Sequence, residues 1–169
     1  MSTPNTKGAV HSNAIGIFRE TATNTFQVVA YSTSGSVELT RETIDATTKD
    51  NDGANVKIMG GQSWSMSADG VVNYVAQNQE GTDVTDVQDS LDLFDAWANK
   101  TELTLAWTTG ASAGASDADY MYKGKAFLSS YSETAGVNDV ATYSCTFEST
   151  GDIEKVQISH GTDTFAVVD

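Results

Sequence analysis

The chain has 169 residues, enough for one domain with its own core, and its 39% hydrophobic residues exclude a disordered acidic tail. Nine Lys and Arg against 23 Asp and Glu give a formal net charge of −14, which argues against a protein that grips nucleic acid or an anionic membrane. A single Cys excludes an intrachain disulfide framework and a Cys-based zinc site, and no run reaches the roughly 18 apolar residues of a membrane helix.

The first part of the chain predicts an arm followed by strands. Residues 1–13 are polar, have no secretion-signal pattern, and predict a flexible N-terminal arm on a soluble protein made in the cytoplasm. We expect a single domain over residues 1–169, with a first strand at 26–31. Residues 36–45 alternate as a half-buried strand does. Its two faces are Val37 and Leu39 on one side and Glu38, Thr40 and Glu42 on the other.

Residues 46–61 have no period and carry turn residues, so they predict a long loop between two strands. Loops of this length in a compact domain usually have a function. The strand predicted over 62–70 then alternates again. Its apolar face is Trp64, Met66 and Ala68, and its polar face is Ser63, Ser65, Ser67 and Asp69.

One helix is predicted at about 86–99, where Thr85 and Gln88 have the spacing of a capping box. A stripe at helical spacing predicts the side that faces the core. The stripe consists of Val87, Leu91, Phe94 and Ala98. Leu93 and Trp97 flank this stripe, where they either widen the contact with the core or touch a neighbouring subunit.

Further strands are predicted at 103–107, at 119–133 with its facing left open, and at 140–150, with short ones near 153–158 and 164–168. The run over 140–150 alternates most clearly. Its apolar side is Ala141, Tyr143, Cys145 and Phe147, and its polar side is Thr142, Ser144, Thr146 and Glu148. Cys145 is therefore expected to be a small core residue. Many strands and one helix predict a mainly β domain with the helix packed beside it.

The sequence offers no pattern typical of an enzyme or a metal site. His11 and His160 are the only histidines, and neither a Gly-x-Ser-x-Gly elbow nor a phosphate-binding Gly-rich loop occurs. Residues 50–53 resemble part of a calcium loop, but Thr48 and Met59 then fall where the ligands belong. We therefore expect no catalytic, cofactor or metal residues.

The polar sides of the three clearest strands consist of Ser, Thr and sparse acids, with no Lys or Arg. Ordinary solvated sheet faces mix both signs of charge, since solubility favours both. A smooth, hydroxylated and anionic face suits a wall along which a polyanion travels without sticking. The simpler alternative is a generic β surface in an acidic protein, and composition alone favours that alternative.

Four segments together resemble the major tail protein family of long-tailed phages. They are residues 42–53, the stretch from Gly60 to Gly70 with its Ser-Trp-Ser-x-Ser-x-Asp-Gly pattern, residues 124–136, and residues 139–152 with Ala-x-Tyr-Ser-x-x-Phe. The resemblance covers roughly 36–70 and 120–153, in the same order and on either side of the predicted helix.

The resemblance implies a β-sandwich or open barrel of two sheets with one flanking helix at about 86–99. It implies six copies in a ring, rings stacked into a hollow tail tube of the virion, and a genome that passes through without specific binding. The implied partners are further copies, the tape measure, terminator and baseplate proteins, and in a contractile tail a sheath, with no cofactor and no membrane.

Two sets of residues emerge when the resemblance is combined with the strand faces. The expected lumen-facing residues are Glu38, Thr40, Glu42, Ser63, Ser65, Ser67, Asp69, Thr142, Ser144, Thr146 and Glu148. The 46–61 loop is expected to bridge to the next ring through Lys49, Asp50, Asp52 and Lys57. Lys123 and Lys125 either bring cations to the lumen or pair with its acids. The alternative function is a carbohydrate- or receptor-binding module that uses Tyr120, Tyr122 and Tyr131.

Overall fold

The computed structural model describes residues 15–23, 25–29, 32–49, 53–73, 90–109, 119–160 and 165–167. These residues form strands β1 (Ile15–Ala22), β2 (Thr25–Val28), β3 (Ser32–Asp45) and β4 (Lys57–Val71), helix α1 (Ser90–Ala98), and strands β5 (Glu102–Thr109), β6 (Asp119–Thr134), β7 (Thr142–His160) and β8 (Phe165–Val167). Within the described ranges, no helix is long and apolar enough to cross a membrane.

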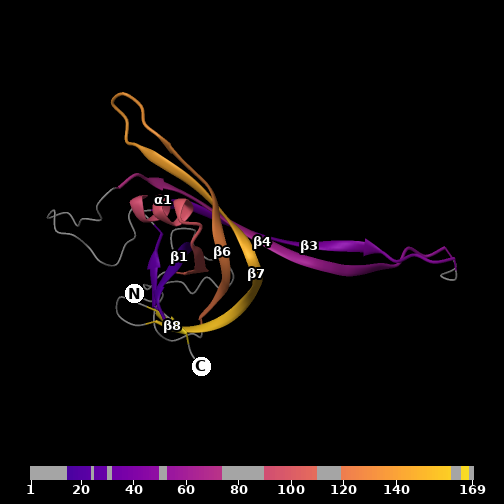
Figure 1. Ribbon diagram of the computed structural model, residues 1–169. Coiled ribbons are helices and arrows are strands. Elements are labelled where there is room, and N and C mark those ends of the chain that lie inside the picture. Colours follow the sequence, from indigo (N-terminus) through magenta and orange to yellow (C-terminus); the bar gives the residue numbers. More distant parts are fainter. Residues whose placement is uncertain are drawn as a thin grey trace, which may run out of the picture.

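All the strands join one antiparallel sheet in the order β2-β1-β5-β6-β7-β4-β3, and β8 pairs with the end of β7. Figure 1 shows β6 and β7 bending through the body, with α1 on the inner side of the bend. The mainly β fold with one helix is confirmed. β6 and β7 continue through the bend, and all the described strands belong to one sheet. The fold is therefore closer to the expected open barrel than to a β-sandwich of two separate sheets.

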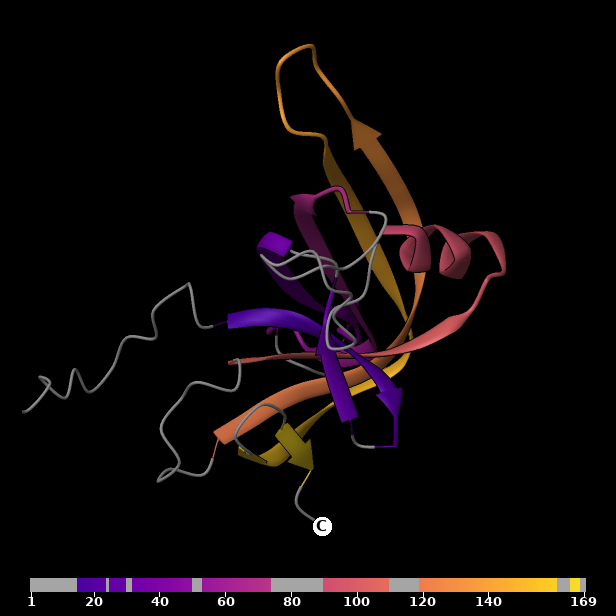
Figure 2. The same cartoon turned by 90° about the vertical axis from the view of Figure 1, so that its left-hand side faces the viewer.

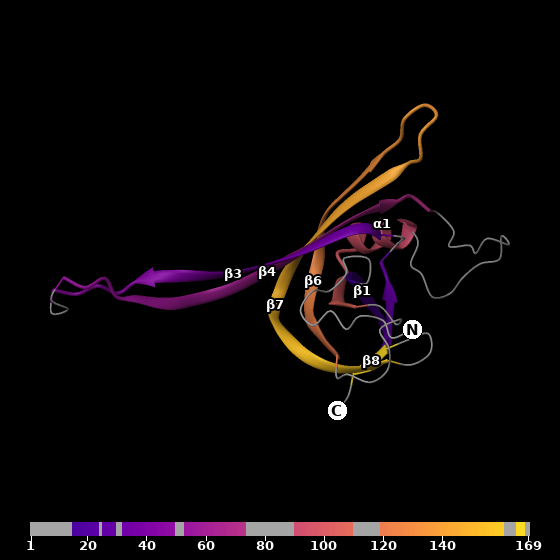
Figure 3. The ribbon, with the colours of Figure 1, turned by 180° about the vertical axis from the view of Figure 1, so that it is seen from behind.

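The β3–β4 hairpin extends well beyond the body (Figure 3). The prediction of a loop over 46–61 is wrong at its C-terminal end, because β4 begins at Lys57 and pairs Ile58 with Ile44. The register shifts between Arg41 and Thr43, where β4 carries an extra residue. This bulge falls at Gly60 and Gly61 and interrupts the alternation by which a strand is recognised.

Two further strands differ from the sequence predictions. β1 (Ile15–Ala22) was not predicted, and it pairs with both β2 and β5. β7 is one strand from Thr142 to His160, where two were predicted on either side of Gly151. Gly151 does not break the strand, because the pairing with β6 continues on both sides of it.

The core centres on Trp64, whose side chain is 3% exposed. Its indole N–H donates to the carbonyl of Gly151 at 2.9 Å, and its backbone N–H donates to Ser149 Oγ at 3.1 Å. The ring lies against the backbone of Gly124, where a Cβ would overlap it. Gly124 is therefore required by close approach of the ring.

Gly124→Ala is expected to lower the free energy of unfolding by about 1–3 kcal/mol, because the hydrogen-bonded Trp64 ring has little freedom to retreat. Urea unfolding followed by Trp fluorescence measures this. Gly61→Ala is the matched control, since no atom lies within 4 Å of its added methyl group. Equal stability of the two variants would show that the ring does not fix Gly124.

Cys145 lies on the apolar side of β7 and is 1% exposed, as its position in the alternation predicted. Burial raises the pKa of its thiol to about 12. The reactive thiolate is therefore scarce at pH 8, and we expect the folded protein to resist a thiol reagent. One equivalent should react after unfolding, since the chain has one Cys. Rapid labelling of the folded protein would contradict this burial.

Helix α1 turns a different side to the core from the one predicted. Ser90, Leu93 and Ala96 are buried, whereas Leu91, Phe94 and Trp97 are each 48% exposed. Ser90 fixes this rotation, because its N–H donates to the Asn73 carbonyl at 2.7 Å and its Oγ accepts from the Asn73 N–H at 3.0 Å. Leu93 and Trp97 flank the predicted stripe, and the sequence left open whether they contact the core or a neighbouring subunit. Leu93 is buried in the core, whereas Trp97 is exposed. Ala98 is also exposed, and Val87 with the expected capping box lies outside the described residues.

Candidate functional site

Four neighbouring strands, β3, β4, β7 and β6, share one hydroxyl-rich face. Their register aligns the side chains in rows across the sheet. The rows are Glu38–Ser65–Glu148–Phe127, Ser36–Ser67–Thr146–Ser130 and Ser34–Asp69–Ser144–Ser132, and Phe127 is their one apolar member. We call these residues, with Thr40, Glu42, Ser63 and Thr142, the polar face. All eleven residues predicted to face the lumen lie on it, with Glu42 at the bulge opposite Gly60.

The opposite side of the same strands is core. The row Val37–Met66–Phe147–Leu128 alternates with the polar rows, and Met66, Phe147 and Leu128 are buried. The polar-face side chains are exposed or half-buried. The Ser and Thr rows are therefore on the surface of the subunit, as the alternation of β4 and β7 predicted.

Hydrogen bonds hold several of these short side chains to the sheet. Ser36 Oγ and Ser67 Oγ lie 2.6 Å apart, and Ser34 Oγ donates to Asp69 Oδ2 at 3.0 Å. In β6, Ser132 Oγ donates to the Ser144 carbonyl at 3.4 Å. Hydroxyls that are engaged with neighbouring strands leave a surface with few projecting donors.

The two lysines of β6 lie on this side of the sheet, and both pair with acids. Lys123 Nζ lies 3.8 Å from Glu20 Oε1, and Lys125 Nζ lies 3.3 Å from Glu102 Oε2. Hydrogen bonds from Thr150 and Lys125 lower the pKa of Glu102. By contrast, no Lys or Arg of the described ranges lies within ion-pair distance of Glu38, Glu42 or Glu148. The polar face is therefore anionic, and both lysines beside it are paired.

Sequence reasoning missed the contribution of β6 to the polar face. Ser130 and Ser132 continue the rows of β7, but the register shifts between Leu128 and Ser130 and again between Gly124 and Ala126. The extra residue at Ser129 interrupts the alternation of β6, and at the other shift the extra residues, 150–152, belong to β7, so the facing of β6 could not be predicted. Ser34 was also missed, because the predicted strand began two residues later.

The β3–β4 hairpin carries a second candidate surface. Lys49 and Lys57 are exposed, and Asp50 and Asp52 lie outside the described residues. At the end of β3, Asp45 Oδ1 accepts from the Thr47 N–H at 2.9 Å. Hydrogen bonds from the side chain of Thr47 and from its N–H lower the pKa of Asp45. Apolar side chains are exposed along the hairpin. They are Ile44, Val56, Ile58 and Met59.

Both borders of the polar face are free strand edges. Among the described strands, β3 pairs only with β4. On the other side, the pairing of β5 with β6 ends at Phe127, so β6 from Leu128 to Thr134 pairs only with β7. Exposed edges of this length invite pairing with another chain.

The three tyrosines considered for a binding module do not form one surface. Tyr120 and Tyr122 are exposed near the start of β6, with Lys155 Nζ 4.1 Å from the centroid of the Tyr120 ring. Tyr131 lies near the far end of the same strand, nine residues or about 30 Å from Tyr122, and packs on Tyr143. This spacing does not suit one ligand platform.

A sequence profile of the phage tail tube protein family matches residues 14–155. The chain belongs to the phage tail tube protein family. It is therefore a structural component of the virion tail and not an enzyme, as the resemblance in its sequence implied. No curated protein sequence matches the chain.

Solved structures confirm the tail tube fold. A chain of the virion of a native gene transfer agent particle superposes with a TM-score of 0.64 at 16% identity, covering 87% of this chain and 98% of that one. A chain from the tail of an empty gene transfer agent particle gives 0.64 at 17%, covering 86% and 98%. The SPP1 tail tube gives 0.65 at 11%, covering 91% and 82%.

Proposed function

We propose that six copies of this chain close into a ring, that rings stack into the tail tube, and that the polar face lines its channel as an anionic conduit for the genome. The number of copies rests on the empty gene transfer agent tail, which is described with C6 symmetry and shares the fold. The observation that carries the proposal is the polar face itself, which four strands build with free edges on both sides.

Pairing β3 of one copy with Leu128 to Thr134 of β6 in the next copy would remove both free edges. This contact is heterologous, so it must close by rotation. Four strands from each of six copies, at about 4.8 Å per strand, give a circumference of at least about 115 Å and a diameter of about 37 Å between backbones. A channel of that size is wider than a DNA duplex.

The charge of the polar face suits passage of DNA. A duplex carries about one negative charge per 1.7 Å of its axis, and each Lys or Arg contact would add a salt-sensitive attraction. A carboxylate wall repels the phosphates over a Debye length of about 8 Å at physiological salt. Pairing of Lys123 and Lys125 with Glu20 and Glu102 offsets their positive charge and so weakens the attraction that they would exert on the duplex.

The β3–β4 hairpin is the proposed link between rings. It projects from the body at one rim of the polar face (Figure 1). Its exposed apolar side chains would be covered by a subunit of the next ring, and Lys49, Asp50, Asp52 and Lys57 would supply the polar contacts. The tape measure, terminator and baseplate proteins, and a sheath in a contractile tail, remain predicted partners of the tube.

Electron microscopy of the purified, concentrated protein tests the proposal. Hollow tubes of uniform width with sixfold symmetry are expected, and they should dissociate on dilution. A protein that stays monomeric at every concentration and is retained on a carbohydrate column would instead support the binding module.

A further inference from the structure

Helix α1 leaves an apolar side uncovered. Leu91, Phe94 and Trp97 fall at successive three-residue steps and are each 48% exposed, and the Phe94 and Trp97 rings contact each other with centroids 6.1 Å apart. Among the strands, α1 contacts β6 most, through the buried side that carries Leu93 and Ala96. Figure 2 shows α1 on the β6 side of the sheet, away from β3 and β4.

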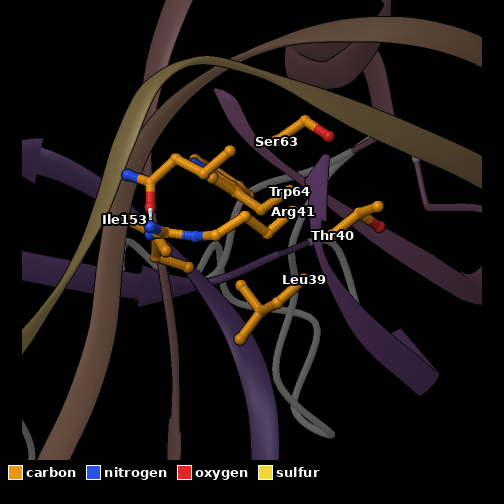
Figure 4. Close-up of a pocket in the computed structure, with 7 residues that line it drawn as sticks. Leu39, Thr40, Arg41, Ser63, Trp64 and Ile153 are labelled. Atoms are coloured by element: carbon orange, nitrogen blue, oxygen red, sulfur yellow. Dashed lines mark hydrogen bonds between the residues drawn. The ribbon is translucent and has the colours of Figure 1, made fainter. Parts of the chain in front are cut away.

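A hollow lies on the opposite border of the four polar-face strands, at β3 and β4, where their hairpin leaves the body. This cavity of about 210 Å³ is lined by Leu39, Thr40, Arg41, Gln62, Ser63, Trp64 and Ile153. Figure 4 shows Arg41, Trp64 and Ile153 close together, with Ser63 and Thr40 pointing away from them. A cavity of about 150 Å³ already accepts a benzene ring, so this one has room for an aromatic side chain.

The hollow is on the core side of the sheet but is not covered by its own subunit. Leu39 pairs with Trp64 in register and shares its side of the sheet, yet Leu39 is 55% exposed. Arg41 borders the opening, and its guanidinium donates to Gln62 Oε1 at 2.6 Å. Gln62 in turn donates to Asp152 Oδ1, which holds the hairpin root to β7.

Joining two copies edge to edge brings these two surfaces together. Within one subunit, Val37 of β3 and Leu128 of β6 lie in the same row across the sheet. When this row continues from one copy into the next, β3 of the first copy lies beside β6 of the second. β6 is the strand that α1 contacts most. Both surfaces are on the core side, away from the polar face. The guanidinium of Arg41 would also meet an aromatic pair next to the exposed carboxylate of Asp95.

We propose that α1 clasps the neighbouring copy within the ring, with Trp97 and Phe94 seated in the hollow at Leu39, Arg41 and Trp64 of that copy. This inference rests on the proposed ring and names a contact that is separate from strand pairing. The clasp covers the aromatic side of α1 and completes the core side of β3 and β4 at each of the contacts around the ring.

Cysteine cross-linking tests the clasp. In assembled Leu39→Cys/Trp97→Cys protein, a short thiol-specific cross-linker is expected to give a ladder of species that stops at six copies, because the contacts close around one ring. Native Cys145 is buried and should not contribute. The matched control is Leu39→Cys/Val137→Cys, which places the second thiol on the exposed β6–β7 turn and should give no ladder.

The outcomes separate the clasp from the ring. Tubes of the Leu39→Cys/Trp97→Cys variant that form without any cross-link would overturn the clasp and leave the proposed ring intact. A ladder that continues past six copies would place the contact between rings, and this result would also overturn the clasp. Wild-type protein that forms no tubes would overturn the proposed function and the clasp together. As a second readout, Trp97→Ala should raise the concentration needed for assembly about tenfold, and Trp97→Phe should recover part of that loss.

Discussion

Deleting residues 49–57 is expected to leave a folded subunit that forms no tubes. The deletion keeps the Ile44–Ile58 pair, so residues 45–48 can close a shorter turn. It removes Lys49, Val56 and Lys57, which are exposed and make few contacts with the body. The free energy of unfolding should therefore change by less than about 1 kcal/mol. Assembly should fail, because the proposed link between rings is gone.

Electron microscopy and sedimentation, at concentrations where the wild-type chain is fully assembled, measure this effect. Single rings without tubes are the expected species. A second variant, Ile58→Ser/Met59→Ser, keeps the hairpin and removes two of its exposed apolar side chains, and it should weaken stacking without abolishing it. Tubes of normal length from the deletion would remove the hairpin from ring stacking.

Reversing charge on the polar face is expected to slow genome passage while leaving tubes intact. Glu38 and Glu148 occupy one row, on either side of Ser65, and both are exposed. Glu38→Lys/Glu148→Lys would give every ring a band of cations that attract phosphates. The rate of DNA ejection from particles built with this variant should fall, and the defect should shrink as salt increases.

The control for charge reversal is Glu38→Gln/Glu148→Gln, which removes the carboxylates without adding cations. This variant should eject DNA at close to the normal rate, because it introduces no attraction. Ejection that is unchanged in the lysine variant would contradict an electrostatic role for the polar face.

The parts of the fold that could be predicted are those where backbone geometry is regular. In β4 from Ser63 to Asp69 and in β7 from Thr142 to Glu148, the paired stretches continue without a register shift, so alternation placed every side chain on its correct side. The same alternation predicted the core position of Cys145. These two strands form the centre of the polar face, and the candidate site was therefore predictable there.

The parts that could not be predicted depend on bulges and on tertiary contacts. Extra residues at Gly60–Gly61 in β4, at Ser129 in β6 and at 150–152 in β7 interrupt the regular pairing, and sequence alternation does not show where these bulges occur. Helix α1 has apolar residues on two adjacent sides. The hydrogen bonds between Ser90 and Asn73 decide which side is buried, and these two residues are 17 positions apart in sequence.

Helical reconstruction of the assembled tube by electron cryomicroscopy tests the central claim most directly. The polar rows through Ser67, Thr146 and Glu148 are predicted to point toward an open channel on the sixfold axis. A map in which these rows face the outside of the tube, or lie in a contact between subunits with no open channel, would contradict the account.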